Sequence, residues 1–180
     1  KSYYNFNYIN IIIIINMIIL IIGNAGCGKS YLGKRLSKDL NIPLFCIDFI
    51  WFKPGGYSKD HERNAKERNA VTKKIMSNKS YIIEGASGIT AKKFAKIASH
   101  LVFIKYPKTV CLKSIRSRKL PSGQISSKAE TDWLYNFAKE YYEKKNTGSC
   151  SLVTHSSIVD KFTKSIYILT NRDDANRLSL

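Results

Sequence analysis

The sequence predicts an α/β fold with a parallel sheet at its centre. Short apolar runs of strand length alternate with longer segments of helical periodicity, which is the pattern of β-α-β units. The chain has 180 residues, of which 44% are apolar and 24% charged, the length and composition of one globular domain. We therefore expect a five-stranded parallel sheet with helices on both faces, and a core that needs no disulfide.

The N-terminal half is expected to supply three strands and two helices. The strands are predicted at Met17–Ile22, Pro43–Ile47 and Tyr81–Glu84, each a short apolar run. The helices are predicted at Lys29–Leu40 and Lys59–Ser77. In the first helix leucine recurs at every fourth position, and Pro43 follows its end. The sequence Lys53-Pro54-Gly55-Gly56 predicts a turn.

The C-terminal half is expected to add two strands and two helices. The strands are predicted at Leu101–Lys105 and Ser165–Leu169, and the helices at Pro107–Lys119 and Ala129–Lys145. Between the helices, the polar segment Leu120–Lys128 predicts a mobile loop. Trp133, Phe137 and Tyr141 share one helix face, so we expect all three in the core.

The first sixteen residues differ from the rest in composition. They contain only Lys, Ser, Tyr, Asn, Phe and Ile, and the first methionine is Met17. We expect 1–16 to be a non-native or disordered extension and 17–180 to form a single domain. The apolar run Ile11–Ile22 is interrupted by Asn16 and is shorter than the about 20 residues of a membrane span, so no membrane association is predicted. The four cysteines form no C-x-x-C pair, which favours a reducing, cytoplasmic location.

The chain is strongly basic. Its 30 Lys and Arg against 13 Asp and Glu give a formal net charge of +17. This charge favours polyanionic partners such as nucleotides or nucleic acid. Most of the basic residues are lysine, which A/T-rich codons encode, so codon bias is an equal alternative. Non-specific nucleic-acid binding therefore stays open as a second function.

A phosphate-binding pattern follows the first predicted strand. The pattern G-x-x-x-x-G-K-[ST] is matched by Gly23, Asn24, Ala25, Gly26, Cys27, Gly28, Lys29 and Ser30, and Tyr31 comes next. Glycines let successive N–H groups point into an anion-sized nest, and the following helix adds its positive dipole end. We expect Lys29 to reach the β- and γ-phosphates of a nucleotide and Ser30 to ligate Mg²⁺. The alternative, a simple glycine-rich turn, does not explain the Lys-Ser pair at that offset.

Two acidic residues are expected near this loop, because ligands bind beyond the carboxyl ends of parallel strands. Asp48 follows the second strand and is a candidate to hold a water on Mg²⁺, to bind an acceptor hydroxyl, or to act as base. Glu84 ends the third strand, and Gly85 opens a flexible turn suited to close substrate approach. Trp51, near Asp48, is expected to stack on an acceptor or to fill the core.

Basic side chains complete the candidate site. Arg116 and Arg118 precede the predicted mobile loop, where a closing lid could neutralise charge on a transferred phosphoryl group. Arg172 follows the last strand and is a candidate to pack against a bound base. A solvated helix surface is the alternative for each. The fourth strand ends in Lys105 and carries no acid there, which leaves any metal-organising role to Asp48 or Glu84.

These segments resemble one protein family. The chain resembles the P-loop proteins named for DNA topology modulation, which are related to adenylate and shikimate kinases. The likeness covers nearly all of 17–180 and is carried by the loop Gly23–Ser30, Ile47-Asp48, Trp51-Phe52-Lys53-Pro54-Gly55, Tyr81-Ile82-Ile83-Glu84-Gly85, Arg116 with Arg118, and Thr170-Asn171-Arg172. It implies a three-layer P-loop NTPase fold with sheet order 2-3-1-4-5. It also implies ATP in the loop and a small lid near 116–128. Lys105 departs from the family pattern, in which an acid often stands at that position.

The residues and the resemblance together predict a cytoplasmic kinase that depends on Mg²⁺ and ATP and phosphorylates a small nucleoside- or nucleotide-like acceptor. In this interpretation the catalytic residues are Lys29, Asp48, Arg116 and Arg118. The acceptor is bound by Asp48, Trp51, Glu84 and Gly85, and the metal by Ser30 and Asp48. The alternatives are a nucleotide-regulated nucleic-acid-binding protein and a nucleotide binder without catalysis.

Overall fold

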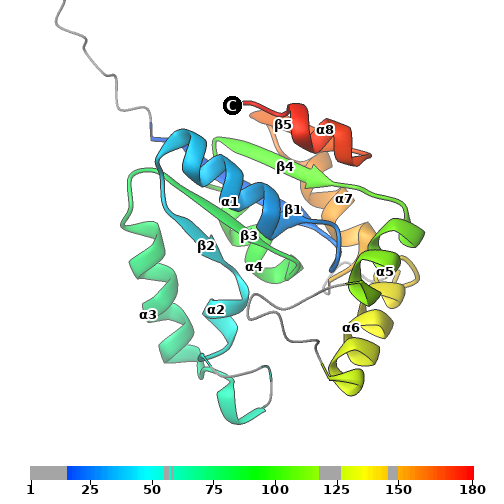
Figure 1. Cartoon of the computed structure of the whole chain (residues 1–180). Helices are drawn as coiled ribbons and strands as arrows, with labels where there is room; N and C mark the ends of the chain where they lie inside the picture. The colour runs from blue at the N-terminus through cyan, green and yellow to red at the C-terminus, as the bar shows by residue number, and fades with distance from the viewer. Residues whose placement is uncertain (1–15, 55–56, 58, 118–126, 146–149) are drawn as a thin grey trace, which may run out of the picture.

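The centre of the molecule is a five-stranded parallel sheet in the order β2-β3-β1-β4-β5 (Figure 1). The structure is a computed structural model that describes residues 16–54, 57, 59–117, 127–145 and 150–180. The strands are β1 (Ile18–Gly23), β2 (Leu44–Cys46), β3 (Tyr81–Gly85), β4 (His100–Ile104) and β5 (Ser165–Leu169). The parallel sheet and its strand order, both expected from the sequence, are confirmed.

Helices cover both faces of this sheet. They are α1 (Lys29–Leu40), α2 (Asp48–Trp51), η1 (Lys59–His61), α3 (Ala65–Met76), α4 (Gly88–Ala95), α5 (Lys108–Arg116), α6 (Lys128–Glu140), α7 (Leu152–Asp160) and α8 (Arg172–Arg177). One face packs against α1, α5 and α8, and the other against α2, α3, α4 and α7. Helix α6 packs on α5. The molecule therefore has three layers, as predicted.

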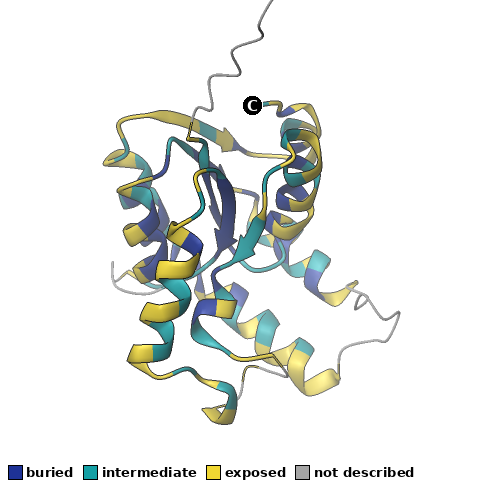
Figure 2. Cartoon of the chain, turned by 90° about the vertical axis from the view of Figure 1, so that its left-hand side faces the viewer, coloured by how far each residue is buried: buried dark blue, intermediate teal, exposed yellow. Residues whose placement is uncertain are grey.

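The core forms because the central strands are apolar on both sides. In β1, Ile19 and Ile21 point into one cluster of buried residues, and Leu20 and Ile22 into the other. Successive side chains of a strand point to opposite faces, so an unbroken apolar run is stable only between two helical layers. Figure 2 shows the same division, with buried strands inside and helices exposed on their outer sides. This places the carboxyl ends of β1, β3 and β4 side by side at one edge.

Several predicted boundaries were wrong. The single helix expected at 59–77 is broken into η1 and α3, because Asn64 starts a new helix. Its side chain accepts a hydrogen bond from the N–H of Glu67, whose carboxylate accepts the N–H of Asn64 in return. Four helices, α2, α4, α7 and α8, were not predicted at all. The last three begin with the capping side chains of Ser87, Ser151 and Asn171, in that order.

The prediction for the aromatic face of α6 was wrong in part. Tyr141 is buried, but Trp133 is 58% exposed and stacks on Phe137 with ring centroids 5.6 Å apart. The helix packs mainly on α5, and part of its apolar face stays uncovered. Arg118, most of the expected lid near 116–128, and 1–15 lie outside the described residues.

The described part of the chain holds no helix that is both long and apolar enough to cross a membrane. The apolar residues that follow Met17 form strand β1 at the centre of the sheet, as the sequence predicted. All four cysteines of the chain are free thiols.

Candidate functional site

The phosphate-binding pattern lies between the end of β1 and the start of α1. Gly26 and Gly28 have φ angles of +75° and +94°, the left-handed region that favours glycine. A Cβ on Gly26 would lie 2.5 Å from the carbonyl oxygen of Cys111 in α5, so this close approach also requires glycine. The loop therefore curls at the N-terminus of a twelve-residue helix, where free N–H groups and the helix dipole favour an anion.

The side chain of Asn24 holds this loop in place. Its Oδ1 accepts the N–H of Ala25 at 2.7 Å, and its Nδ2 donates to the carbonyl oxygen of Ala138 at 2.8 Å. Ala138 belongs to α6, the helix that follows the expected lid. The loop geometry thus depends on a helix far away in the sequence.

Lys29 is buried against the loop that precedes it. Its Nζ donates to the carbonyl oxygen of Asn24 at 2.8 Å. Burial by itself lowers the pKa of the Lys29 ammonium, whereas Cys27 and the carboxylate of Glu84 raise it. The net direction is upward, so Lys29 keeps its positive charge beside the loop. Burial raises the pKa of the Cys27 thiol to about 11, which leaves the loop thiol uncharged at neutral pH.

Ser30 and Glu84 meet although 54 residues separate them. The Ser30 hydroxyl donates to Oε1 of Glu84 at 2.8 Å. The register of β1 and β3 pairs Ile21 with Glu84, which brings this buried carboxylate to the same edge as the loop. From the sequence, Glu84 was assigned to the acceptor and Ser30 to the metal. The contact supports the second role that the sequence left open for Glu84, that of organising a metal ion.

The oxygens of Ser30 and Glu84 fit Mg²⁺, a hard cation that prefers oxygen donors. Among the residues that the structure describes, no group of three or more His, Cys, Asp or Glu side chains could hold a metal ion. Mg²⁺ usually keeps several waters and uses one or two protein carboxylates together with substrate phosphates. The pair therefore suits a magnesium ion that arrives with a nucleotide.

Asp48 begins α2 immediately after β2. The N–H of Ile47 donates to the carbonyl oxygen of Glu84 at 2.7 Å, which joins the ends of β2 and β3. Burial raises the pKa of Asp48; Lys29 opposes this shift, and Glu84 adds to it. The net result is a raised pKa for a carboxyl group that lies in the field of a lysine. Such a group is a good candidate for a general base.

The turn after β3 is packed on both sides. A Cβ on Gly85 would lie 2.5 Å from the Cβ of Ile47, so glycine lets this turn approach the start of α2. On the other side, Nε2 of His155 donates to the carbonyl oxygen of Ala86 at 3.1 Å, and Tyr141 donates its hydroxyl to Nδ1 at 2.8 Å. Burial lowers the pKa of His155 to about 3, so the ring is neutral, as this hydrogen-bond pattern requires.

His155 was assigned no role from the sequence, because no neighbouring residue there suggests a partner. Its partners come from the β3 turn and from the end of α6. His155 therefore supports the turn that follows Glu84 and Gly85, a role that only the folded structure reveals.

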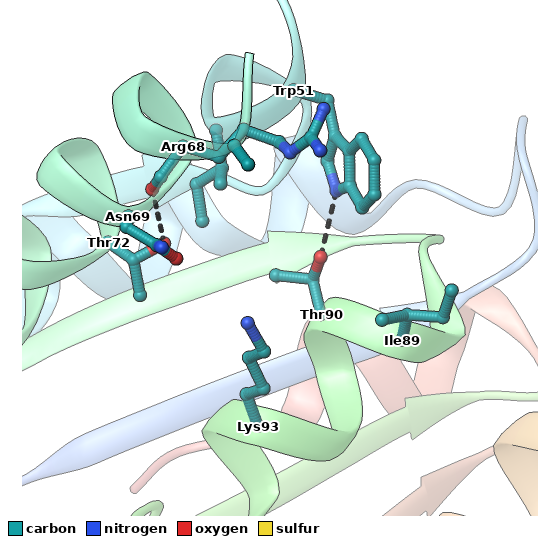
Figure 3. A pocket seen from close by; sticks show the side chains of 9 residues that line it. Trp51, Arg68, Asn69, Thr72, Ile89, Thr90 and Lys93 are labelled. Carbon is teal, nitrogen blue, oxygen red and sulfur yellow. Dashed lines mark hydrogen bonds between the residues drawn. The ribbon is translucent and has the colours of Figure 1, made fainter. Parts of the chain in front are cut away.

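Trp51 lies at the side of a pocket between α2, α3 and α4 (Figure 3). Its Nε1 donates to the hydroxyl of Thr90 at 2.8 Å, and the guanidinium carbon of Arg68 lies 4.6 Å from the centre of a ring of its indole. The pocket has a volume of about 220 Å³. The sequence predicted that Trp51 binds the phosphoryl acceptor, whereas it gave no role to Arg68 or Thr90.

Three other predicted residues, Arg116, Arg172 and Tyr31, have exposed side chains. Arg116 is exposed, and its guanidinium lies 4.3 Å from the ring centre of Tyr135 in α6. Arg172 is exposed at the start of α8, and Tyr31 is 68% exposed on α1. Among the described residues, no hydrogen bond or ion pair links any of these three side chains to the phosphate loop. The structure brings together Lys29, Ser30, Asp48 and Glu84 and does not bring these three to them.

Known structures share this architecture. No model of a known protein family matches the chain. A shikimate kinase from Acinetobacter baumannii in complex with shikimate superposes with a TM-score of 0.53 at 17% identity, over 89% of each chain. A shikimate kinase from Bacteroides thetaiotaomicron gives 0.51 at 18% identity, over 89% of this chain and 92% of that one.

A gluconokinase from Sinorhizobium meliloti 1021 gives a TM-score of 0.51 at 12% identity, over 89% of this chain and 90% of that one. At these identities the likeness is one of fold. It agrees with a five-stranded parallel sheet in the order β2-β3-β1-β4-β5 with helices on both faces. The chain therefore has the three-layer fold of the P-loop small-molecule kinases.

Proposed function

We propose that this chain is a kinase that transfers the γ-phosphoryl group of ATP to a hydroxyl of a small acceptor, with Mg²⁺ bound beside the nucleotide. One observation carries the proposal: a lysine, a serine and two carboxylates meet at the carboxyl ends of β1, β2 and β3. They are Lys29, Ser30, Asp48 and Glu84. Ligands of open parallel sheets bind at this edge.

The phosphate loop binds the triphosphate of ATP. Its N–H groups surround the phosphate oxygens, and the Lys29 ammonium neutralises the β- and γ-phosphates. Lys29 now donates to the carbonyl oxygen of Asn24, and the phosphates replace that acceptor. Phosphoryl transfer depends on positioning and charge stabilisation, so this cation supplies a large part of the catalysis.

Ser30 and Glu84, with Asp48 nearby, hold the metal ion or its waters. When bound there, Mg²⁺ would supply positive charge that neutralises the charge developing on the phosphate oxygens. The Ser30–Glu84 hydrogen bond of 2.8 Å keeps both oxygens oriented toward the loop. Glu84 is 4% exposed, so its carboxylate is held by burial as well as by this bond.

Asp48 activates the acceptor. The acceptor hydroxyl oxygen forms a bond to the γ-phosphorus, and the bond from that phosphorus to the β–γ bridging oxygen breaks. ADP leaves with that electron pair, and the Asp48 carboxylate takes the hydroxyl proton. The raised pKa of Asp48 makes it a stronger base than an exposed aspartate.

The other predicted residues complete this proposal. Gly85 and Trp51 contact the acceptor, and Arg116 stabilises transferred charge together with Arg118, which lies outside the described residues. Tyr31 and Arg172 contact the nucleotide outside the phosphates. The similar structures are named as kinases, and one holds shikimate, which supports a small hydroxylated acceptor. Membership of the family named for DNA topology modulation and a cytoplasmic location belong to the same proposal.

The test is acceptor-dependent ATP hydrolysis or transfer by the full chain, across nucleosides, nucleotides and small hydroxylated acids. Lys29→Met is expected to lower acceptor-stimulated turnover by at least about 100-fold. Lys34→Met removes an exposed lysine of the same helix and is the matched control. Near-native turnover in Lys29→Met would refute the mechanism. No stimulation by any acceptor would favour the nucleotide-regulated nucleic-acid-binding protein or the non-catalytic binder.

A further inference from the structure

The pocket beside Trp51 is cationic. It is lined by Ile50, Trp51, Ala65, Arg68, Asn69, Thr72, Ile89, Thr90 and Lys93. Two of these side chains are positively charged, three are neutral hydrogen-bonding groups, and none is a carboxylate. A concave site with this lining selects an anion.

The Arg68 guanidinium is ion-paired with Glu62 through one nitrogen and keeps other donors unpaired in the described part of the chain. Its Nη1 donates to the carbonyl oxygen of Arg63 at 2.7 Å and lies 3.4 Å from Oε1 of Glu62. Among the described residues, its Nε and Nη2 make no hydrogen bond. The guanidinium is also held over the indole of Trp51, so these donors are oriented before any ligand binds. An arginine with two unpaired N–H donors can donate to two oxygens of one carboxylate or phosphate.

Lys93 faces Arg68 across the pocket. Figure 3 shows its side chain extending from α4 toward the side chains of α3. No hydrogen bond or ion pair occupies its ammonium within the described residues. A lysine with no acidic neighbour in its pocket is a ready partner for an anionic oxygen. Asn69 and Thr72 lie on the α3 side and can add neutral hydrogen bonds.

The pocket adjoins the proposed catalytic cluster. Trp51 and Asp48 lie three residues apart in α2, and α4 follows directly from the turn that carries Glu84. Its volume of about 220 Å³ is below the about 300–1,000 Å³ that encloses a drug-sized ligand. It therefore suits one end of an acceptor and not a whole nucleotide.

We infer that this pocket binds an anionic group of the phosphoryl acceptor, a carboxylate or a phosphate, through Arg68 and Lys93. The inference rests on the proposed kinase function and narrows its acceptor class: an acid or a phosphorylated compound is bound in preference to its neutral analogue. The acceptor's apolar surface packs on Trp51 and Ile89, and its reacting hydroxyl lies toward Asp48.

The test is direct binding of matched pairs to the full chain without ATP, at about 150 mM salt so that diffuse attraction is screened. The pairs are gluconate and glucitol, glucose 6-phosphate and glucose, and AMP and adenosine. In at least one pair the anion is expected to bind at least about tenfold more tightly than its neutral partner. The first pair reports a carboxylate site, and the other two a phosphate site.

Two variants assign that preference to the pocket. Lys93→Gln and Arg68→Met are each expected to reduce the preference to a few-fold, with Arg68→Lys restoring part of it. Lys96→Gln, one turn further along the same end of α4 and also exposed, is expected to keep it. Thermal unfolding of each variant checks that the fold is retained.

Equal binding of both members in every pair, including no binding at all, overturns the inference. So does a preference that survives in both Lys93→Gln and Arg68→Met. Because this assay needs neither ATP nor turnover, its result is separate from that of the kinase assay. A chain without kinase activity that still prefers the anions through Lys93 would overturn the proposed function and keep the anion site.

Discussion

Asn24 of the phosphate loop donates a hydrogen bond to the backbone carbonyl of Ala138, 2.8 Å away on α6. Only 1% of Asn24 is exposed, and its other side-chain atom accepts the N–H of Ala25. One buried amide therefore joins the phosphate loop to the helix that follows 118–126. The shape of the loop is thus sensitive to the position of α6.

Replacement of Asn24 by alanine should loosen this loop. The substitution leaves the carbonyl of Ala138 and the N–H of Ala25 without their partner, which costs about 1–3 kcal/mol for each buried group. We expect a lower free energy of unfolding in urea and weaker ATP binding by titration. Asn136→Ala changes an exposed residue of the same helix and should leave both unchanged. Wild-type ATP affinity in Asn24→Ala would show that the loop does not need this anchor.

Glu84→Gln should change the magnesium requirement. The glutamine carbonyl can still accept the Ser30 hydroxyl, but the negative charge is lost. We expect the Mg²⁺ concentration for half-maximal activity to rise about 10–100-fold, the usual cost of a lost metal-organising partner. The measurement is turnover against Mg²⁺ at saturating ATP, with the exposed Glu140→Gln as control. An unchanged Mg²⁺ curve would assign Glu84 to another role.

Asp48 should govern the acidic side of the pH–rate profile. Burial raises its pKa above the ordinary value of 3.8, and the protonated carboxyl cannot accept the acceptor's proton. Turnover should therefore fall as the pH is lowered through this raised pKa. Asp48→Asn should lower kcat by about 10²–10⁴-fold and remove this limb. A limb that persists in the residual activity of Asp48→Asn would belong to a different group.

The raised pKa of Asp48, which favours catalysis, lowers the stability of the folded chain at neutral pH. The folded state raises the pKa of Asp48, so the unfolded chain loses this proton at lower pH, and ionisation at neutral pH costs folding free energy. Asp48→Asn should therefore unfold at a urea concentration equal to or above that of the unmodified chain at pH 7. A clear loss of stability would mean that the carboxylate is better paired than its burial suggests.

His155 should make the fold sensitive to acid. Burial lowers its pKa from 6.5 to about 3, so below pH 6.5 the unfolded chain binds a proton that the folded chain excludes. The contribution of His155 to the free energy of unfolding is complete above pH 6.5 and is lost as the pH falls from 6.5 toward about 3. From pH 7 to pH 5 this group removes about 2 kcal/mol.

Urea unfolding at pH 7 and pH 5 measures this effect. His155→Gln should unfold with a smaller difference between the two pH values, although its stability at pH 7 is lower because Tyr141 and Ala86 lose their partner. The partly exposed His61, replaced by Gln, is the control. An unchanged pH dependence in His155→Gln would place the acid sensitivity elsewhere.

The phosphate loop and the three central strands could be predicted because their signals are local. An apolar run as long as Met17–Ile22 can be stable only inside a sheet covered on both faces, and the Gly-Lys-Ser spacing has few other uses. The strand order came from a family resemblance and agrees with the structure. Helix starts were less predictable, because the two reciprocal hydrogen bonds between Asn64 and Glu67 outweighed a continuous charged segment.

Trp133 shows where helical periodicity misleads. Its spacing with Phe137 and Tyr141 predicted a core face, but α6 packs mainly on α5 and Trp133 stays exposed. The pattern describes which side chains share a face and carries no information on whether another element covers that face.

Only long-range contacts show which candidate side chains lie together. From the sequence, Asp48 and Glu84 were both acids at strand ends, with Asp48 assigned to catalysis and metal and Glu84 to the acceptor. The pairing of Ile21 with Glu84 brings Glu84 to the hydroxyl of Ser30 and leaves Asp48 near the charge of Lys29. The partners of Asn24 and of His155 likewise lie on other elements, 114 and 69 residues away for Ala138 and Ala86. Local order follows from neighbours along the chain, whereas distances between strand ends exist only once the sheet has formed.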